Sequence, residues 1–316
     1  MNGTLLSCIF FAVGVILIIK SGDLFVDGAS GIAKAMRIPT FIIGATVVSL
    51  ATTMPEMIVS VMASLDGKND MAIGNAVGSV TCNTGLILGI AMTAMTIICP
   101  RKKYLRQCAL LIAATVVLFL SSLTGVLSAV GSVVLTAIFA LFMAENIRSA
   151  KLSASEESVG GERSPLSPRD ILYFLSGTVG IVVGSRFMVE YGSEIALSFG
   201  VSERMISLTL VAVGTSLPEL VTTLTAIAKK EYALSVGNIV GANVIDIALI
   251  LPVCSLISGS RIPVSRGSVT VDMPVCIATV CLALVPMLVR EKASKLLGVL
   301  LLLSYAAYTA LVVGAA

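Results

Sequence analysis

One long segment occurs twice in this chain. Residues 48–89 and 211–252 align without a gap at a constant offset of 163 positions. The alignment superposes Pro55-Glu56 on Pro218-Glu219, Gly74-Asn75 on Gly237-Asn238, Gly78 on Gly241 and Asn83 on Asp246. A repeat of this length constrains the fold strongly, because both copies are expected to build the same local structure. Each copy places a glutamate directly after a proline inside a strongly apolar segment.

The composition indicates an integral membrane protein. Of the 316 residues, 57% are hydrophobic and 12% are charged, whereas soluble domains have about 45–50% apolar and about 25% charged residues. The sequence has no histidine, which removes the usual zinc ligand and the usual general base. The seven cysteines form no CxxC motif and indicate no disulfide framework. The first apolar stretch lacks a basic leader, so we expect a retained span rather than a signal peptide.

The apolar segments predict an all-α membrane protein with ten transmembrane helices. A span needs about 20 mainly apolar residues. The expected spans are residues 3–20, 40–65, 70–98, 105–123, 126–147, 170–188, 204–228, 233–258, 269–289 and 295–315. The polar stretch 149–169 is rich in Ser, Gly and Glu, and we expect a flexible cytoplasmic linker there. It separates a first five-helix repeat, 1–148, from a second, 170–316.

The basic residues predict the orientation of the chain. With the N-terminus outside, sixteen of the 21 Lys and Arg residues fall in cytoplasmic connections, as expected from the excess of positive charge on that side of membrane proteins. The five outer ones are Lys68, Arg186, Arg204, Arg261 and Arg266. We therefore expect a multi-pass protein of the cell membrane with both termini outside. Five spans per repeat is an odd number, so the second repeat is inverted relative to the first, as in many secondary transporters.

The repeated carboxylates are expected near the middle of the bilayer. Glu56 precedes the surface residue Asp66 by ten positions, which is roughly 15 Å along a helix and half of the ~30 Å hydrocarbon core. Asn83 returns to the same depth after the turn, and Glu219 and Asp246 repeat this geometry. A carboxylate at this depth is a functional hypothesis by default. A structural ion pair is disfavoured, because neither repeated core contains Lys or Arg except at its turn.

The residues beside each glutamate favour a cation as its partner. Pro55 and Pro218 remove a backbone donor and disturb the helix, and the break frees carbonyl groups that can line a cavity. Thr52-Thr53 and Thr215-Ser216 supply hydroxyl groups. Carboxylates, carbonyls and hydroxyls form an all-oxygen set, which suits hard cations such as Ca²⁺ or Na⁺ and disfavours copper or zinc.

Two glycine pairs predict close helix packing beside these residues. Gly74-x-x-x-Gly78 and Gly237-x-x-x-Gly241 are patterns of small residues that let helices approach each other. Three carboxylates around one small cavity repel each other. We expect Asp246, whose counterpart is the amide Asn83, to act mainly as a hydrogen-bonding or weak ligand.

At these residues the sequence resembles the cation/calcium exchanger superfamily, and most closely its prokaryotic sodium/calcium exchanger branch. The resemblance covers the whole chain. It is carried by Ala51-Thr-Thr-Met-Pro-Glu56 with Gly74-Asn-x-x-Gly-Ser79, and by Gly214-Thr-Ser-Leu-Pro-Glu219 with Gly237-Asn-x-x-Gly-Ala-Asn243. The spacing of 27 residues from Glu56 to Asn83 recurs from Glu219 to Asp246. The resemblance implies two inverted five-helix halves around four central cation sites.

The resemblance also implies a set of cation ligands. Glu56 and Glu219 are expected to form the core of the calcium site. The further side-chain ligands would be Thr53, Ser79, Asn83, Ser216 and Asp246, and the backbone carbonyl ligands would be Ser49, Thr52, Ala212 and Thr215. The sequence departs from the commonest family pattern where Ala242 stands opposite Ser79 and Val80 opposite Asn243. These departures leave the calcium site intact and bear on the affinity of the flanking sodium sites.

These observations predict a secondary antiporter, not an enzyme, that exchanges Na⁺ for Ca²⁺ by alternating access. We expect electrogenic exchange, no cofactor, no nucleic-acid partner, a lipid bilayer as surroundings, and function as a monomer. A calcium/proton or potassium-dependent exchanger is the nearest alternative, since two carboxylates carry protons as readily as sodium. A cation channel is more remote, because broken helices also line pores. An intramembrane aspartyl protease is disfavoured by the absence of a GxGD motif.

Overall fold

The structure, a computed structural model, describes residues 2–94, 97–157, 166–200 and 212–315, and almost all of them are helical. Four short π-helical turns in these residues interrupt or precede α-helices, and they carry the labels η1, η2, η4 and η5. The elements up to the polar stretch are α1 (Asn2–Met36), α2 (Thr40–Ile43), η1 (Gly44–Val48), α3 (Ser49–Thr52), α4 (Met54–Leu65), α5 (Asn69–Cys82), η2 (Asn83–Ile87), α6 (Leu88–Ala94), β1 (Ile97–Ile98), α7 (Arg101–Ser122), β2 (Val126–Leu127) and α8 (Ala129–Glu157).

The part of the chain after the polar stretch follows the same plan. Its elements are α9 (Pro168–Ser198), α11 (Ala212–Gly214), α12 (Leu217–Ala228), α13 (Tyr232–Ile245), η4 (Asp246–Ile250), α14 (Leu251–Ile257), β3 (Ile262–Pro263), η5 (Ser268–Asp272), α15 (Met273–Arg290), β4 (Lys292–Ala293) and α16 (Lys295–Ala315). The turns η2 and η4 begin at Asn83 and Asp246, which are equivalent positions of the repeat.

Within the described residues, eight helices are long and apolar enough to span a membrane. A ninth is counted if 40–52 and 54–65, which meet at a bend of 48°, form one span. The expected span at 204–228 lies partly outside the described residues, and its described end contains the apolar helix α12. The prediction of an α-helical membrane protein is therefore confirmed, and the count of ten spans stays a prediction.

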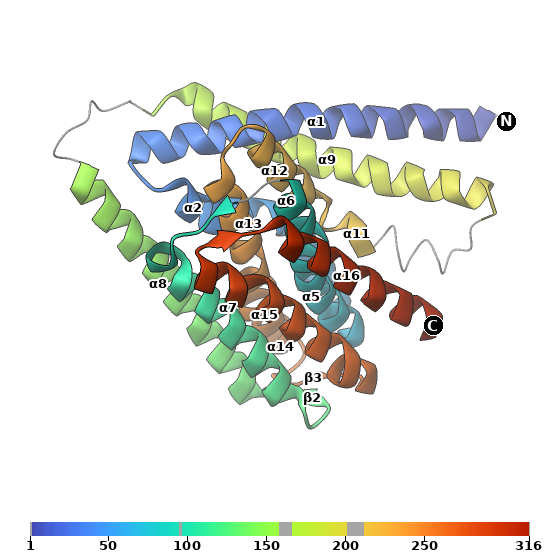
Figure 1. Ribbon diagram of the computed structural model, residues 1–316. Coiled ribbons are helices and arrows are strands. Elements are labelled where there is room, and N and C mark those ends of the chain that lie inside the picture. The colour runs from blue at the N-terminus through green and yellow to red at the C-terminus, as the bar shows by residue number, and fades with distance from the viewer. Residues whose placement is uncertain (1, 95–96, 158–165, 201–211, 316) are drawn as a thin grey trace.

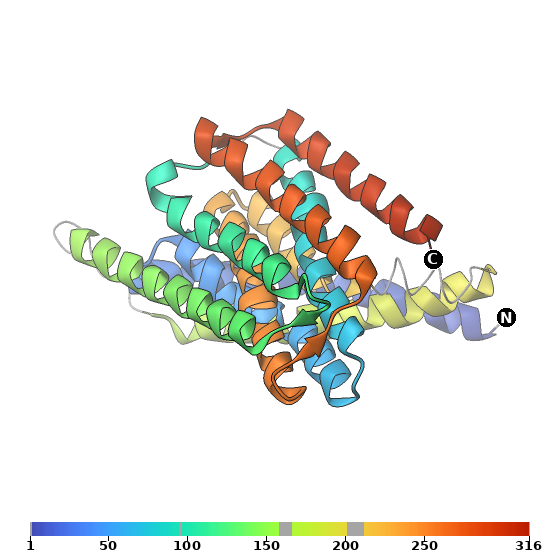
Figure 2. The same ribbon diagram turned by 90° about the horizontal axis from the view of Figure 1, so that it is seen from below.

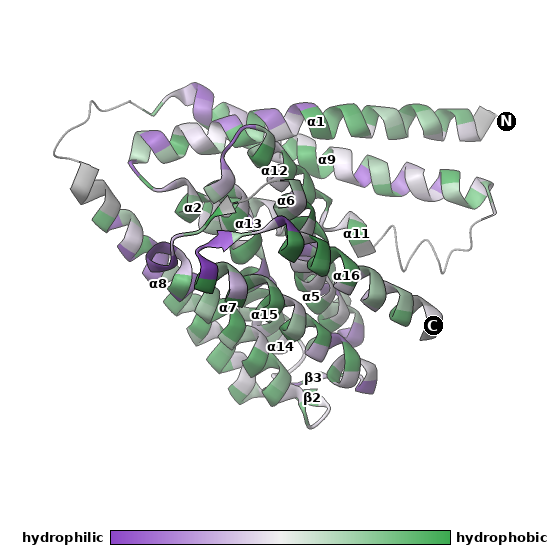
Figure 3. Cartoon of the chain, in the orientation of Figure 1, coloured by the Kyte–Doolittle hydropathy of each residue, from purple (hydrophilic) through white to green (hydrophobic). Residues whose placement is uncertain are grey.

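Two long spans, residues 69–94 and 232–257, form the centre of the molecule. The apolar windows of α5–α6 and α13–α14 are 78% and 83% buried, whereas those of the other six long helices are only 17–44% buried. The outer helices instead expose large apolar side chains, for example Ile16, Val133, Leu175 and Leu303. Figure 3 shows hydrophobic residues along most helices and hydrophilic residues gathered mainly near helix ends. This distribution fits a protein whose outer face contacts lipid.

The first and sixth helices are longer than the sequence indicated. The expected spans 3–20 and 170–188 become α1 (Asn2–Met36) and α9 (Pro168–Ser198), so the prediction that 21–36 forms a connection is wrong. The two helices lie side by side across the bundle (Figures 1 and 2) and pack closely along each other. Contact is close because Gly177 has no side chain: an added Cβ would lie 2.7 Å from the Cα of Phe25. This packing stabilises α1 and α9 as helices that are longer than the bilayer requires.

The molecule also contains four two-residue strands, so an all-α description is wrong in this detail. β1 pairs with β4, and Ile97 lies opposite Ala293; β2 pairs with β3, and Val126 lies opposite Pro263. Each pair joins a connection from the first part of the chain to one from the second. The strands escaped sequence analysis because a two-residue ladder has no hydrophobic period.

The polar stretch is less irregular than its composition indicated. Helix α8 continues to Glu157, nine residues into the stretch 149–169 that we expected to be a linker, and α9 begins at Pro168. Ser167 caps α9 and forms a capping box with Asp170. Residues 158–165 lie outside the described part, and the division of the chain into two repeats stays a prediction.

The two glycine pairs differ in their surroundings. At Gly237 an added Cβ would collide with the carbonyl oxygen of Phe41, and at Gly241 it would lie 2.5 Å from Ser49 Oγ and 2.6 Å from the Ala45 carbonyl oxygen. The second pair thus lets α13 pack directly on the α2–η1 backbone, as expected. A Cβ at either glycine of the first pair meets nothing within 4 Å in the described part of the chain.

We predict that Gly237→Ala destabilises the protein. The added methyl group cannot be accommodated without a backbone shift, which typically costs about 1–3 kcal/mol. Gly267→Ala is the matched control, because Gly267 has helical dihedral angles and only Ser265 Oγ, 4.0 Å away, near an added Cβ. The control should be neutral or stabilising, since alanine favours a helix over glycine by about 1 kcal/mol. Thermal unfolding in detergent measures both, and equal unfolding temperatures for the two variants would contradict the packing described.

Candidate functional site

Each glutamate sits just after a break in its helix. Thr53 (φ −83°, ψ 1°) separates α3 from α4, and Ser216 (φ −87°, ψ 7°) separates α11 from α12. Both residues have nearly the same non-helical conformation, and a proline follows two positions later in each case. Proline fits the first turn of the new helix, where its missing N–H has no intrahelical acceptor to lose. The repeated sequence therefore builds the same broken helix twice.

The two breaks face each other across the repeats. Ser216 Oγ donates a hydrogen bond to Glu56 Oε1 over 3.4 Å, and Thr53 Oγ1 donates to Glu219 Oε1 over 3.2 Å. Each glutamate thus receives a hydroxyl group from the opposite repeat. Both carboxylates have no solvent-exposed surface. The arrangement places the two acidic groups in one buried polar centre that neither repeat could form alone.

Several oxygen atoms in this centre have no hydrogen-bond donor among the described residues. They are Glu56 Oε2, Glu219 Oε2, Asn83 Oδ1, Thr215 Oγ1 and both carboxylate oxygens of Asp246. A buried polar group without a partner costs about 1–3 kcal/mol. The unpartnered atoms here are mainly acceptors, which is the chemistry that a bound cation satisfies.

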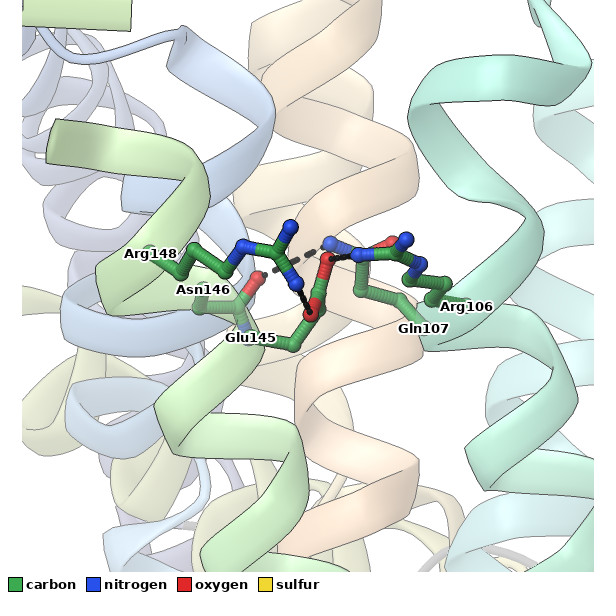
Figure 4. A network of polar contacts seen from close by, with 5 residues as sticks. All are labelled: Arg106, Gln107, Glu145, Asn146 and Arg148. Atoms are coloured by element: carbon green, nitrogen blue, oxygen red, sulfur yellow. Dashed lines mark hydrogen bonds and ion pairs between the residues drawn. The ribbon is translucent and has the colours of Figure 1, made fainter. Parts of the chain in front are cut away.

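No basic side chain compensates the carboxylates. In the described part of the chain, Glu56, Glu219 and Asp246 take part in no ion pair. Glu145 on α8 shows the contrast: it contacts Arg106 at 2.5 Å and Arg148 at 3.9 Å (Figure 4). The described residues thus supply no fixed counter-charge for the central group, and a cation as its partner stays a prediction.

A cation here needs more than carboxylates. Among the residues that the structure describes, no three Asp, Glu, Cys or His side chains are close enough together to hold a metal ion. Hydroxyl, amide and carbonyl oxygens must therefore complete any coordination shell. Such a mixed oxygen shell suits Ca²⁺, which takes 6–8 oxygen ligands, and Na⁺.

The other expected ligands lie around the same breaks, with some differences. Buried side chains are found at Ser49, Thr52, Ser79, Asn83 and Asp246, whereas Thr215 is half-buried and Ala212 begins α11. The Ser49 carbonyl oxygen accepts a hydrogen bond from Thr53 N–H (2.9 Å) and also lies within hydrogen-bond distance of Thr53 Oγ1 (2.6 Å) and Thr52 Oγ1 (3.3 Å). Each hydroxyl has a single proton, which it shares between this carbonyl and its acceptor in the opposite repeat, Glu219 for Thr53 and Asn238 for Thr52. The role of the Ser49 carbonyl as a cation ligand therefore requires these bonds to rearrange, and the ligand set as a whole stays a prediction.

Three asparagines that the ligand prediction omitted, Asn75, Asn238 and Asn243, support the centre. Asn75 Nδ2 donates to the Glu56 carbonyl oxygen over 3.2 Å and to Ser60 Oγ over 2.9 Å. The equivalent Asn238 accepts a hydrogen bond from Thr52 Oγ1 over 3.2 Å. Asn243 bonds to both Asn83 and Thr84. The signal for the first two was present in the sequence, because Gly74-Asn75 and Gly237-Asn238 coincide in the repeat.

A cavity lies beside α9, next to the two helix breaks. It has a volume of about 300 Å³ and is lined by Pro55 and Thr215 next to the breaks, and by Arg186 and Glu190 on α9. The equivalent positions on α1 are Asp23 and Asp27. Their carboxylates instead lie 3.6 Å and 2.7 Å from Lys229 Nζ. Arg186 and Glu190 of α9 thus line a cavity next to the breaks, whereas Asp23 and Asp27 of α1 bind the turn between α12 and α13.

Comparison with known proteins assigns the chain to a family. The sequence profile of the sodium/calcium exchanger protein family matches residues 6–147 and 170–314. The chain belongs to the sodium/calcium exchanger family. The resemblance inferred from the repeated motifs is therefore confirmed, and the family consists of ion-exchange transporters, not of enzymes.

Individual relatives agree with this assignment. The inner membrane protein YrbG of Escherichia coli is 34% identical, with 82% of each chain covered. The sodium/calcium exchanger MaX1 of Methanosarcina acetivorans is 27% identical, with 93% of this chain and 95% of MaX1 covered. A structure of the sodium-calcium exchanger NCX_Mj soaked with Na⁺ and Sr²⁺ superposes with a TM-score of 0.84 at 30% identity, covering 96% of this chain and 98% of that one.

We predict that Thr53→Val weakens cation binding. The change removes the hydroxyl that Glu219 receives from the opposite repeat while keeping the shape of the side chain. One hydrogen bond contributes about 0.5–1.5 kcal/mol, so the half-saturating concentration of the transported cation should rise about two- to tenfold. Thr81→Val is the matched control, because the Thr81 hydroxyl is also buried and bonds the carbonyl four residues earlier, Val77, but touches no carboxylate. Equal effects of the two substitutions on the cation dependence of flux would contradict a role for the bond to Glu219.

Proposed function

We propose that this chain is a secondary antiporter that exchanges Na⁺ for Ca²⁺. The observation that carries the proposal is the pair of buried glutamates, Glu56 and Glu219, each bonded by a hydroxyl of the other repeat and each with one oxygen free. One Ca²⁺ or several Na⁺ can neutralise these carboxylates, so the two ions compete for one centre. Competition for one centre is the basis of exchange, because one ion leaves when the other binds.

The proposed ligands are those that the resemblance to the exchanger family implies. Glu56 and Glu219 bind Ca²⁺ at the core. Side-chain oxygens of Thr53, Ser79, Asn83, Ser216 and Asp246, and carbonyls of Ser49, Thr52, Ala212 and Thr215, complete the calcium site and the flanking sodium sites. Asp246 acts as a weaker ligand than the glutamates, because it follows a continuous helix and gains no hydroxyl donor comparable to those of Thr53 and Ser216.

We further propose ten spans in two inverted five-helix repeats and transport by alternating access. The span at 204–228 supplies the tenth helix, and the broken helices α3–α4 and α11–α12 enter the bilayer from opposite sides. The ions at the interface then belong to both repeats, so a relative movement of the repeats opens the centre first to one side and then to the other. Exchange of more than two Na⁺ per Ca²⁺ moves net charge, which makes the exchange electrogenic. Since each centre is formed within one chain, a monomer suffices.

The functional test is calcium flux in proteoliposomes. Glu56→Gln and Glu219→Gln should each reduce sodium-driven ⁴⁵Ca²⁺ uptake to the level of empty liposomes, because an amide keeps the size of the side chain but not its charge. Glu145→Gln is the control: it removes a carboxylate whose partners are Arg106 and Arg148, and partly exposed pairs contribute little. This control should transport calcium like the parent.

Three outcomes of the same assay would change the proposal. Near-normal uptake in either glutamine variant would show that its carboxylate is not a core ligand. Uptake driven by a proton gradient, or only in the presence of K⁺, would indicate a calcium/proton or potassium-dependent exchanger. Single-channel currents in a planar bilayer would indicate a channel instead.

The proposed topology has its own test. Cysteines introduced at Asn2 and Gly314 should both react with a membrane-impermeant reagent from outside, and one at Lys151 on α8 should not, because the positive charges place that end of α8 in the cytoplasm. The parent for this assay carries Cys8→Ser, since Cys8 is exposed. Opposite accessibility of Asn2 and Gly314 would be incompatible with an even number of spans.

A further inference from the structure

A chain of hydrogen bonds supports the amide of Asn83 from the opposite repeat. Asn83 Nδ2 donates to Asn243 Oδ1 over 3.1 Å, and Asn243 Nδ2 in turn donates to Thr84 Oγ1 over 2.8 Å. All three side chains are at most 1% exposed. Asn243 lies on α13, which contacts the turn η2 that begins at Asn83. The arrangement leaves Asn83 Oδ1 without a donor among the described residues.

The repeat shows that this support is specific to the amide. At the offset of 163, Asn83 becomes Asp246, Thr84 becomes Ile247, and Asn243 is replaced by Val80. All the polar members of the network except the central acid are therefore apolar in the other copy. Val80 and Ile247 are also fully buried, so the contrast is not one of exposure. An amide has one acceptor end and one donor end, whereas a carboxylate has two acceptor ends. Only the amide therefore needs a partner that accepts hydrogen bonds from its N–H groups.

We propose that Asn243 is a positioning residue for cation binding: it accepts the N–H of Asn83 and thereby holds the Asn83 carbonyl oxygen toward the transported cation. This inference rests on the proposed function, in which Asn83 is a ligand. Thr84 completes the arrangement by accepting the N–H of Asn243, so that Asn243 keeps its own oxygen directed at Asn83. Asn243 itself does not touch the ion.

The physical consequence lies in cation affinity. Without an acceptor at position 243, binding of a cation to Asn83 Oδ1 leaves the buried Nδ2 unpaired, and an unpaired buried donor is costly. The alternative, rotation of the amide, turns its N–H groups toward the cation. Either outcome disfavours the bound state more than the empty state. The loss should therefore appear in the cation concentration that half-saturates transport and less in the maximal rate.

The test is a double-mutant cycle between Asn83→Ala and Asn243→Val. Valine is the residue that the other repeat carries at this place. Sodium-driven ⁴⁵Ca²⁺ flux in proteoliposomes is measured as a function of Na⁺ and of Ca²⁺. Asn243→Val alone should raise the half-saturating concentration of at least one of the two ions about fivefold or more, a change that corresponds to one unpaired buried donor. In the Asn83→Ala background the same substitution should have no further effect on affinity, because no amide remains to be held. Thr84→Val should give a smaller change of the same sign.

The outcomes separate the inference from the proposed function. If Asn83→Ala itself leaves both cation dependences unchanged, Asn83 is not a ligand, and both this part of the proposed function and the inference are wrong. If Asn83→Ala weakens binding but Asn243→Val does not, the inference alone is wrong. Equal losses of affinity from Asn243→Val in the parent and in Asn83→Ala would show a general structural role and would also overturn the inference.

If the valine variant does not fold, Asn243→Ala enters the same cycle, and the shift of the thermal unfolding temperature by Ca²⁺ and Na⁺ measures binding without transport. Thr81→Val serves as the control for loss of a buried polar group in α5.

Discussion

The structure depends on the burial of carboxylates that have no basic partner among the residues that the structure describes. Moving an isolated charge from water into a low-dielectric interior is strongly unfavourable, and a membrane offers no water to reduce that cost. Glu56 and Glu219 nevertheless have no exposed surface, and only one oxygen of each accepts a side-chain hydrogen bond. The helix breaks, the hydroxyls beside them and the asparagines behind them all lower the cost of holding this centre ready for a cation. A transporter must leave the charge of such carboxylates partly uncompensated in the empty site. A permanent lysine or arginine partner would stabilise the empty site and exclude the ion.

The two repeats build the centre jointly, but they do not contribute identical chemistry. The broken helices correspond closely, since Thr53 and Ser216 share one backbone conformation. Away from the centre the charges differ: Asp23 on α1 pairs with Lys229, whereas the equivalent positions carry Arg186 and Asp66, with both signs reversed. Asp66 here lies 3.6 Å from Lys68 on its own turn. The backbone plan is therefore common to both halves, while the side chains adapt each half to its own surroundings.

Much of the site could be predicted from the sequence because the repeat marks it twice. The coincidence of Pro55-Glu56 with Pro218-Glu219 identified the breaks and the carboxylates, and hydrogen bonds across the breaks join these residues in the structure. The common depth in the bilayer that helix arithmetic gives stays a prediction. The extension of α1 beyond residue 20 could not be predicted in this way, because it depends on packing against α9 at Gly177 rather than on apolar length. Hydropathy likewise gave no indication of the short strands. The support of Asn83 by Asn243 could not be predicted for another reason. The two positions are not equivalent in the repeat, so an alignment of the two copies does not place them opposite each other.

The difference between Asn83 and Asp246 limits the charge of the centre. With an amide at the first position, the three carboxylates Glu56, Glu219 and Asp246 supply at most three negative charges. In the proposed site a divalent cation would neutralise the two glutamates that receive hydroxyl groups across the repeats. Asp246, with Val80 and Ile247 in the places of polar supports, accepts no hydrogen bond from the described residues. A second aspartate at position 83 would offer one more acceptor oxygen than the amide, but it would also add a fourth negative charge and its repulsion. An amide, however, presents that oxygen only if its other end is satisfied. The neutral ligand therefore reduces repulsion between carboxylates but needs a fixed orientation, and the hydrogen bond from Asn83 to Asn243 meets this need.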